Sequence, residues 1–371
     1  MNDQNLYRIA LTLVKGVGHI TAKQLLKTVG DAEAIFKEKR KTLEALPGIG
    51  SYTAASLHDP DILKRAEKEL CFIEKNQIQT FFIADDDYPA RLKECADSPV
   101  LLFFKGNTSF NIPKVISIIG TRHATEYGKK MTEEMVGGLA AIFPDILIIS
   151  GLAYGIDILA HRAALKNSLA TVGVLAHGLD RIYPGSHRGT AVSMLERGGL
   201  LTDFLSETNP DRPNFVMRNR IIAGLSDCTL VVESAGKGGA LITADIAFSY
   251  GRDVLAVPGK TDDLYSLGCN KLIKQNKAAL VESTEDIINA LCWEKNEKKK
   301  PKAVQTQLFP VLTKEEQVIY DILSKEEMQL NLLSIQANLP IYLLTPLLFE
   351  LEMKGIIRCL PGGIYRVKTV F

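Results

Sequence analysis

The chain has 371 residues, of which 46% are hydrophobic and 23% are charged, and its formal net charge is +1. This composition is typical of a soluble globular protein with two or three domains. It excludes a strongly basic surface, so any contact with nucleic acid has to come from a local patch. No apolar run approaches the roughly 18 residues of a membrane span, and the N-terminus lacks the apolar core of a signal peptide. We therefore expect a cytoplasmic protein without a membrane segment.

The six cysteines are scattered along the chain and include no C-x-x-C pair. This pattern argues against a zinc ribbon and against a disulfide framework. We expect reduced, mostly buried thiols and no metal site.

Residues 1–78 contain an internal repeat, which predicts a small helical domain. The segment Lys15–Ala22 returns as Pro47–Ala54, and each copy predicts a G-x-G turn between two short helices. The glycines leave room for backbone N–H groups at the start of the second helix to approach an anion. The repeat resembles the helix-hairpin-helix units of DNA-binding proteins. Because neither turn carries a run of Lys or Arg, two interpretations stay open: contact with DNA phosphates, or packing of the hairpins on each other or on a neighbouring domain.

Residues 79–292 show short apolar runs that alternate with helical stretches, which is typical of a parallel sheet covered on both faces. We predict an α/β fold: a Rossmann-like doubly wound parallel sheet, flanked by the N-terminal helical domain and by a C-terminal winged-helix domain. The predicted central strands are rich in Val, Ile and Leu, as strands buried on both faces are. They are Val115–Ile119, Ile146–Ile149, Thr171–Ala176, Thr229–Val232 and Val254–Val257.

Residues 293–310 are rich in charge and show neither the helical nor the strand periodicity of apolar residues. This predicts a linker before a small domain at 311–371. That domain has helical patterns near 314–323, 331–337 and 343–354, followed by a hairpin with a Pro361-Gly362-Gly363 turn. Three helices and a hairpin resemble a winged helix. The third helix carries no Arg or Lys before Lys354, so a role in protein contact or packing is at least as well supported as DNA reading.

Three loops that follow the predicted strands are rich in glycine and small polar residues: Gly120–Arg122, Ser150–Asp157 and Glu233–Ala240. In an open α/β sheet, ligands bind at the carboxyl ends of the strands, where such loops present N–H groups to anions. The loops therefore predict a ligand that bears phosphate. Neither the P-loop pattern nor the dinucleotide fingerprint is present in the sequence, so we expect neither NTP hydrolysis nor a nucleotide cofactor.

Arginines stand beside these loops. Arg122 stands at the end of a predicted strand. Because its planar guanidinium is permanently charged, we expect Arg122 to bind a phosphate group. Arg218 and Arg220 precede an apolar run, and two interpretations stay open for them. An extended or capping segment would aim both at one DNA backbone, or both would be surface charges paired with acids such as Asp211 or Asp227.

Asp157 and His161 are four residues apart on one predicted helix. This spacing predicts a hydrogen-bonded pair that fixes the helix under the ligand loop. No Ser or Cys nucleophile stands in a recognisable elbow, and two side chains do not make a zinc site. We expect no catalytic centre.

These motifs, taken in order, resemble the DNA-processing protein A (DprA) family. Thr121 stands where the family has Ser, and the segments at Ser186–Arg188 and Phe215–Val216 depart from the usual pattern. The segments that carry the resemblance are Gly120–Arg122, Ser150–Asp157 with Ala160-His161, Gly178–Asp180 with Tyr183-Pro184, Ser206-Glu207, Arg218–Ser226, Gly239–Ala244, Gly251-Arg252, Val257–Gly259 and Gly268–Ile273.

The resemblance implies a non-catalytic protein that binds single-stranded DNA and loads the RecA recombinase onto incoming DNA during natural transformation and recombination. It also implies a homodimer, with the dimer patch near 267–279, and no cofactor. The residues that we assign to DNA binding are Gly120, Thr121, Arg122, Ser150, Gly151, Arg188, Arg218, Asn219, Arg220, Lys237, Gly238, Gly239 and Lys260.

Two alternatives compete with this interpretation. Nucleotide phosphoribohydrolases of the lysine-decarboxylase-like group have similar parallel strands, but their P-G-G-x-G-T-x-x-E loop ends in a catalytic Glu. Here the corresponding loop is followed by Ile242, Thr243 and Ala244, and no Glu occurs before Glu282. The second alternative is a protein-interaction scaffold that keeps only the fold.

Overall fold

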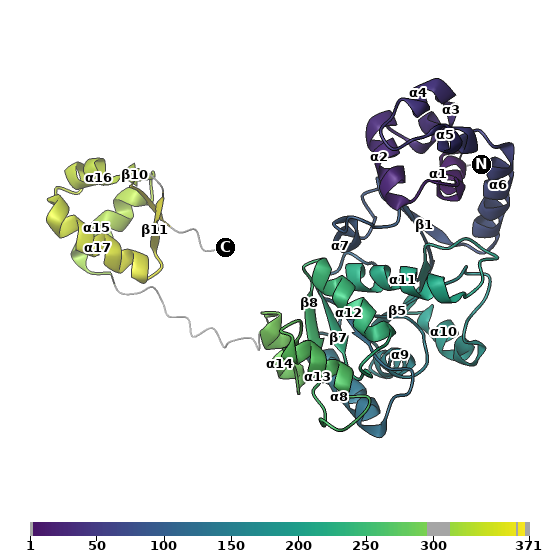
Figure 1. The fold of residues 1–371 in the computed structure, drawn as a ribbon. Helices are drawn as coiled ribbons and strands as arrows, with labels where there is room; N and C mark the ends of the chain where they lie inside the picture. Colours follow the sequence, from purple (N-terminus) through teal and green to yellow (C-terminus); the bar gives the residue numbers. More distant parts are fainter. Residues whose placement is uncertain (1–2, 295–311, 361–362, 368–371) are drawn as a thin grey trace. The chain divides into compact units, whose positions relative to one another are not determined.

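The computed structural model describes residues 3–294, 312–360 and 363–367, and the chain divides into two compact units, Met1–Asn296 and Glu297–Phe371 (Figure 1). The predicted linker lies almost entirely outside the described residues. Among the described helices none is by itself long and apolar enough to cross a membrane. Only the pair Leu330–Gln336 and Ile341–Met353, bent by 106°, passes that test by length and composition.

The first unit begins with six helices that contain the predicted repeat. Gly16 and Gly48 occupy equivalent places in the two turns and have φ of 83° and 81°, the left-handed region that glycine enters at little cost. Each turn is followed by a helix whose N-cap is the second glycine, Gly18 or Gly50. The helices are α1 (Asp3–Leu13), α2 (His19–Val29), α3 (Ala32–Lys37), α4 (Arg40–Glu44), α5 (Ser51–Leu57) and α6 (Pro60–Lys75).

The centre of the first unit is a nine-stranded sheet with the order β1-β2-β6-β5-β4-β3-β7-β8-β9. Strands β6 to β9 in this order are parallel, and β2 and β1 continue the sheet antiparallel at the β6 edge. The strands are β1 (Gln79–Phe82), β2 (Leu101–Gly106), β3 (Val115–Ile119), β4 (Leu147–Ser150), β5 (Ala170–Val174), β6 (Gly198–Thr202), β7 (Cys228–Val231), β8 (Asp253–Ala256) and β9 (Ala279–Leu280).

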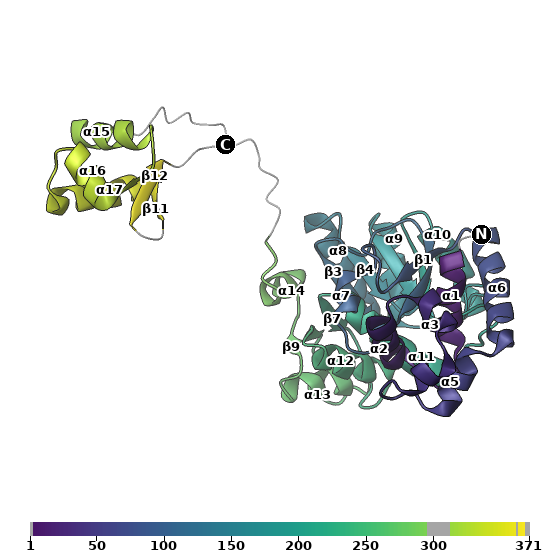
Figure 2. The ribbon, with the colours of Figure 1, turned by 90° about the horizontal axis from the view of Figure 1, so that it is seen from above.

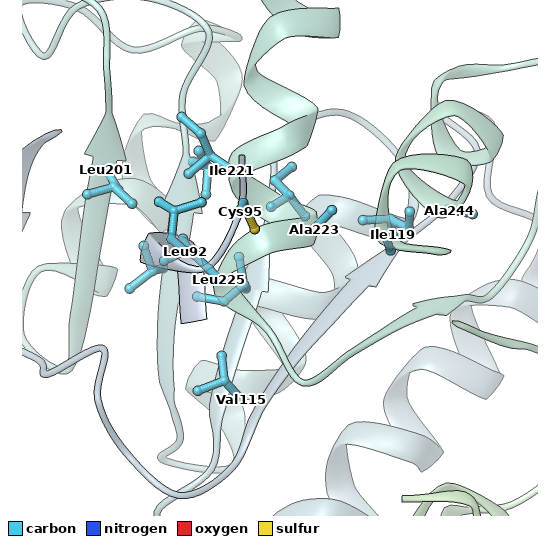
Figure 3. Close-up of a cluster of buried hydrophobic side chains, with 14 of the residues drawn as sticks. Leu92, Cys95, Val115, Ile119, Leu201, Ile221, Ala223, Leu225 and Ala244 are labelled. Atoms are coloured by element: carbon cyan, nitrogen blue, oxygen red, sulfur yellow. The ribbon is translucent and has the colours of Figure 1, made fainter. Parts of the chain in front are cut away.

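Helices cover both faces of this sheet, so the predicted doubly wound α/β fold is confirmed. One face packs on α8 (Glu126–Ile142), α9 (Ile156–Lys166) and α14 (Thr284–Ala290). The other packs on α7 (Ala90–Lys93), α11 (Arg212–Leu225), α12 (Gly239–Ser249) and α13 (Leu267–Lys274). Alternate residues of β3 enter the two cores. Val115 and Ile119 belong to the same core as Ile221, Ala223 and Leu225 of α11, and Figure 3 labels all five.

The five strands predicted from apolar runs are all present, within two residues at each end. Four further strands, β1, β2, β6 and β9, were not predicted. β6 begins with Gly198-Gly199, residues of low strand propensity. These glycines let the backbone approach its neighbours closely: a Cβ at Gly198 would fall closer than 3.0 Å to the carbonyl oxygen of Thr171.

The N-terminal helices pack against the antiparallel edge of the sheet, and α1 and α6 lie near β1 in both views (Figures 1 and 2). Their core is continuous with Phe82 of β1 and with Leu101 and Phe103 of β2. Arg8 of α1 also forms a bidentate ion pair with Asp85, at 2.8 and 2.7 Å. Helical region and sheet therefore form one compact unit.

The second unit contains α15 (Lys314–Leu323), α16 (Leu330–Gln336), α17 (Ile341–Met353) and the hairpin of β11 (Ile357–Leu360) and β12 (Ile364–Val367). A short strand that was not predicted, β10 (Met328–Gln329), adds to the hairpin in the order β10-β12-β11. The core of this unit includes Ile319, Leu333, Leu344 and Leu348. The arrangement agrees with the predicted winged helix, while Pro361 and Gly362 of the predicted turn lie outside the described residues.

Candidate nucleic-acid interface

The glycine-rich loops meet at the carboxyl edge of the sheet. From β3 the chain moves to β4 on one side, and it later returns to β7 on the other side of β3. The point where strand order reverses is where ligands of open α/β sheets bind. The loops that follow β3, β4 and β7 are therefore neighbours, as the sequence predicted.

Two of the glycines allow this close approach. Gly155 has φ of 75°, and a Cβ there would fall closer than 3.0 Å to the carbonyl oxygen of Thr121. A Cβ at Gly120 would clash with Ile156, the first residue of α9. The Thr121 carbonyl oxygen also accepts a hydrogen bond from the Ile156 N–H, at 3.1 Å. The loop after β3 is thus fixed against the start of α9.

The loop after β4 directs its polar groups inward. The Gly151 N–H donates to Oδ2 of Asp157 at 3.1 Å, and the Gly151 carbonyl oxygen accepts from Arg218 at 2.7 Å. The Ser150 hydroxyl donates to the Ile118 carbonyl oxygen at 2.6 Å. The expectation that Ser150 and Gly151 present polar groups to DNA is therefore wrong: these groups already hold the loop together.

Arg218 lies beneath this loop and not in front of it. Its side chain is buried and donates to the carbonyl oxygens of Gly151 and Val174. Burial lowers the pKa of Arg218 to about 10, against the opposing effect of Asp157, so the guanidinium remains charged at neutral pH. Asn219 is buried as well. Arg218 supports the site from below, and the prediction that these two buried residues contact DNA directly is corrected accordingly.

The Arg220 side chain also binds groups inside the protein. It forms an ion pair with Asp203, with 2.5 Å between Nη2 and Oδ2, and it donates to the carbonyl oxygens of Met217 and Asp97. Both partners of the ion pair are buried. The expectation that the Arg220 head faces the DNA is wrong, because α11 turns this residue toward the helical region. The acids proposed as alternative partners, Asp211 and Asp227, do not pair with it; Asp227 binds Arg91.

Asp157 and His161 have separate partners. Asp157 accepts from Gly151, whereas Nδ1 of His161 lies 2.7 Å from the Thr171 hydroxyl. Burial raises the pKa of Asp157 and lowers the pKa of His161 to about 3. The predicted pair does not form, although each residue does anchor α9 beneath the loop.

Four of the predicted cationic side chains are exposed at the carboxyl edge: Arg122, Arg188, Lys237 and Lys260. Within residues 3–294, none of the four forms an ion pair. They follow β3, β5, β7 and β8, which lie across the sheet in the order β5-β4-β3-β7-β8. With strands about 4.8 Å apart, the ends of these five strands span roughly 19 Å. Arg188 stands further from its strand than the other three, as the first residue of α10 (Arg188–Met194).

The glycines near Lys237 leave space for a ligand. Gly238 is the N-cap of α12, and a Cβ at Gly238 or Gly239 would meet no atom within 4 Å. Lys260 borders a hollow of about 650 Å³, whose lining also includes Tyr127, Asp263 and Glu282. The edge of the sheet is therefore open on the β7 and β8 side.

Phe215 is a site residue that is missing from the DNA-binding residues predicted from the sequence. It lies in the first turn of α11, and its ring is 5.5 Å from the guanidinium carbon of Arg122 and 5.9 Å from that of Arg218. A partly exposed aromatic ring beside cations is the combination on which unpaired bases stack. The signal in the sequence was an aromatic residue three positions before Arg218.

The carboxylate of Glu233, the first residue of the glycine-rich loop after β7, is engaged. It is buried and accepts from both the N–H and the hydroxyl of Thr125, the N-cap of α8. A Cβ at Gly128 would clash with the same carboxylate. Glu233 therefore fixes the start of α8.

The first hairpin of the helical region faces the α/β core. His19 lies 3.7 Å from Asp203, and Lys23 donates to the carbonyl oxygens of Cys95 and Ala96 and to the Ser98 hydroxyl. Burial, together with Arg220 and Lys23, lowers the pKa of His19 to about 4. Of the two interpretations of this hairpin, packing on a neighbouring domain has direct support.

Three family models match the chain. DNA recombination-mediator protein A matches residues 79–292, the SAM-like helix-hairpin-helix tandem matches 9–59, and the DprA winged helix domain matches 301–363. The predicted helix-hairpin-helix and winged-helix regions are confirmed.

Known proteins resemble the chain over most of their length. DNA processing protein DprA of Bacillus subtilis is 41% identical over 215 residues, which cover 58% of this chain and 71% of that protein. The structure of DNA processing protein A from Streptococcus pneumoniae superposes with a TM-score of 0.62 and 30% identity, covering 78% of this chain and 98% of the other. The structure of DNA processing protein A from Helicobacter pylori, described for its single-stranded DNA binding mode, superposes with a TM-score of 0.53 and 28% identity. This match covers 58% of our chain and 96% of the other.

Proposed function

Because the chain belongs to the DNA recombination-mediator protein A family, we propose that it binds single-stranded DNA at the carboxyl edge of its sheet and delivers the strand to RecA. This delivery would serve recombination, including natural transformation. The proposal adds a ligand, a partner and a set of residues to the family membership.

The observation that carries the proposal is the row of exposed cations with Phe215 beside Arg122. Arg122, Arg188, Lys237 and Lys260 would neutralise consecutive phosphates, because the row follows the sheet edge over roughly 19 Å. Gly238 and Gly239 would let the backbone of the strand approach the start of α12. Arg218 would add positive potential from below without touching the ligand.

A single strand fits this arrangement better than a duplex. Phe215 can stack only on a base that is not stacked in a helix. In the described residues near the row, the cations stand on loops and helix starts, and they do not form the face of a helix that could enter a groove. We therefore expect the protein to prefer unpaired strands.

We propose a binding role without catalysis. The two carboxylates within the glycine-rich loops are engaged, Glu233 by Thr125 and Asp157 by Gly151. A general base has to reach a substrate proton, and these two are already used as hydrogen-bond acceptors inside the protein. This supports the mediator over a phosphoribohydrolase.

We also propose a homodimer that uses α13 and β9. Strand β9 is the edge of the sheet, and both Leu267 and Leu280 are exposed there. An edge strand with exposed apolar residues favours pairing with another chain. A dimer would place two DNA sites in one particle.

The test is fluorescence anisotropy of a labelled oligo(dT) strand and of a duplex of equal length, each titrated with the protein. We expect tight, salt-dependent binding of the strand and weaker binding of the duplex. In a second assay, RecA assembles on a strand coated with single-strand-binding protein, and we expect the protein to shorten the lag. Equal affinity for duplex and strand would refute the site, and an unchanged lag would refute the delivery to RecA.

A further inference from the structure

We propose that Tyr154 and Tyr183 are base-stacking residues, so that the site holds successive unpaired bases as well as phosphates. The inference rests on the proposed function and deepens it: the ligand would be a strand with unstacked bases, held by a rim of aromatic rings. Phe215 is one member of that rim, and the two tyrosines extend it along the carboxyl edge toward β4 and β5.

Tyr183 extends the rim from Phe215. It stands in the loop after β5, and its ring centroid lies 6.0 Å from that of Phe215, with an interplanar angle of 57°. Phe215 in turn lies beneath the guanidinium of Arg122. A phosphate bound at Arg122 would therefore have two rings within the reach of its adjoining bases.

Tyr154 lies in the loop after β4 and is held by the next loop. Its ring centroid is 4.8 Å from that of His187, at an interplanar angle of 71°, and its hydroxyl accepts from Ser186 at 3.4 Å. His187 is itself buried and bonds through Nδ1 to the Leu152 carbonyl oxygen, at 2.9 Å. Tyr154 is thus positioned by contacts with the segment that contains Ser186 and His187.

These contacts form a continuous circuit around the loop after β4. Arg122 contacts Phe215, Phe215 contacts Tyr183, and the segment from Tyr183 to His187 leads to Tyr154. The next residue, Gly155, is packed against the backbone of Arg122. The rim therefore encloses the loop that Arg218 supports from below.

Both tyrosines are held and yet half exposed: Tyr154 is 48% accessible and Tyr183 is 46% accessible. A ring that only filled the core would be covered. An aromatic face is a surface on which every base can stack, because each base has a π face. Stacking of this kind gives affinity without sequence preference, and it depends little on salt because no counterion is released.

The test compares Tyr154→Ala, Tyr183→Ala and the double variant in the full chain, with Tyr→Phe at each position as the conservative replacement. We expect each Ala variant to weaken oligo(dT) binding roughly 5- to 150-fold, the range of one stacked base. The Phe variants should bind like the parent, and the slope of log affinity against log salt should not change. An oligomer of equal length that lacks bases should bind the parent and the Ala variants alike.

The matched control is Phe248→Ala. Phe248 is an aromatic residue with similar accessibility, 51%, but it lies at the C-terminal end of α12, away from the carboxyl edge. The Phe248→Ala variant should bind DNA like the parent. The inference fails if both Tyr→Ala variants bind oligo(dT) like the parent, or if they lose equal affinity for the oligomer without bases. Failure of the parent to bind any strand would instead refute the proposed function.

Discussion

Arg220 and Asp203 form a buried ion pair, with 2.5 Å between Nη2 and Oδ2, at the place where the α/β core meets the first helical hairpin. His19 of that hairpin lies 3.7 Å from the same carboxylate. Tyr250 donates to Asp97, whose carbonyl oxygen accepts from Arg220. Arg220 therefore joins two parts of the first unit, and its effect on DNA binding would be indirect.

The first prediction is that Arg220→Ala destabilises the fold by about 3 to 5 kcal/mol, because it leaves the Asp203 carboxylate buried without its cation. Urea denaturation measures the change in the free energy of unfolding. Asp203→Asn should be similarly costly, and the double variant should cost less than the sum of the two single changes. The control is Arg188→Ala, an exposed arginine, which should stay within about 0.5 kcal/mol. If Arg220→Ala lowers the free energy of unfolding no more than Arg188→Ala does, the structural role of Arg220 is contradicted.

The second prediction concerns Gly155, whose φ of 75° and contact with the Thr121 carbonyl oxygen exclude a side chain. Gly155→Ala should destabilise the protein by at least about 1 to 2 kcal/mol and weaken strand binding, because the loop that carries Arg122 has to move. The matched control is Gly137→Ala in α8, outside the proposed site, where the new Cβ would lie 3.9 Å from the Asn167 side chain, an ordinary contact. Thermal melting and anisotropy on both variants check the prediction, and a parent-like Gly155 variant would contradict the packing.

The third prediction is a loss of stability in mild acid. The folded-state pKa is about 3 for His161 and about 4 for His19, both below the usual 6.5. The unfolded chain therefore binds more protons below pH 6.5, so the stabilisation is complete above that pH and decreases as the pH falls. Each histidine should account for about 2 kcal/mol between pH 7 and pH 5.

His19→Gln tests this dependence, because His19 lies at the surface of contact between the hairpin and the core and can be replaced with less disturbance than His161. Denaturation at several pH values should show a shallower loss between pH 7 and pH 5 in the variant than in the parent. An identical pH profile in the two proteins would mean that His19 is not kept neutral by its surroundings.

The sheet was predictable because its signal is local. Val115–Ile119 is rich in β-branched residues, with Ser117 as its one polar member, and such apolar runs identify strands buried on both faces. The G-x-G repeat was predictable for a similar reason, since both turns need glycine in the left-handed region. β6 was missed because Gly198 and Gly199 serve close packing between strands, which is a property of the neighbours and not of the segment.

The candidate site was only partly predictable, because charge does not reveal burial. Arg122 and Arg218 look alike in the sequence, yet one is exposed and the other lies beneath a loop 67 residues earlier in the chain. The partner of Arg220, Asp203, is 17 residues away and directly follows β6. Aromatic residues such as Phe215 and Tyr183 could not be assigned to the site from the sequence, because they come together only in the fold, where three loops meet at one edge of the sheet.

The last prediction separates the exposed arginine from the buried one. Arg122→Ala should weaken strand binding by about 1 to 3 kcal/mol, the range for hydrogen bonds to charged groups, and should reduce the salt slope by about one. The melting temperature should hardly change, since the guanidinium is exposed. Arg218→Ala should instead lower both affinity and stability, because it removes the donor to the Gly151 and Val174 carbonyl oxygens and leaves the space beneath Gly151 empty. Anisotropy at several salt concentrations, together with melting curves, distinguishes the two variants. If Arg122→Ala binds like the parent while Arg218→Ala loses affinity without losing stability, the phosphate contacts have been assigned to the wrong arginine.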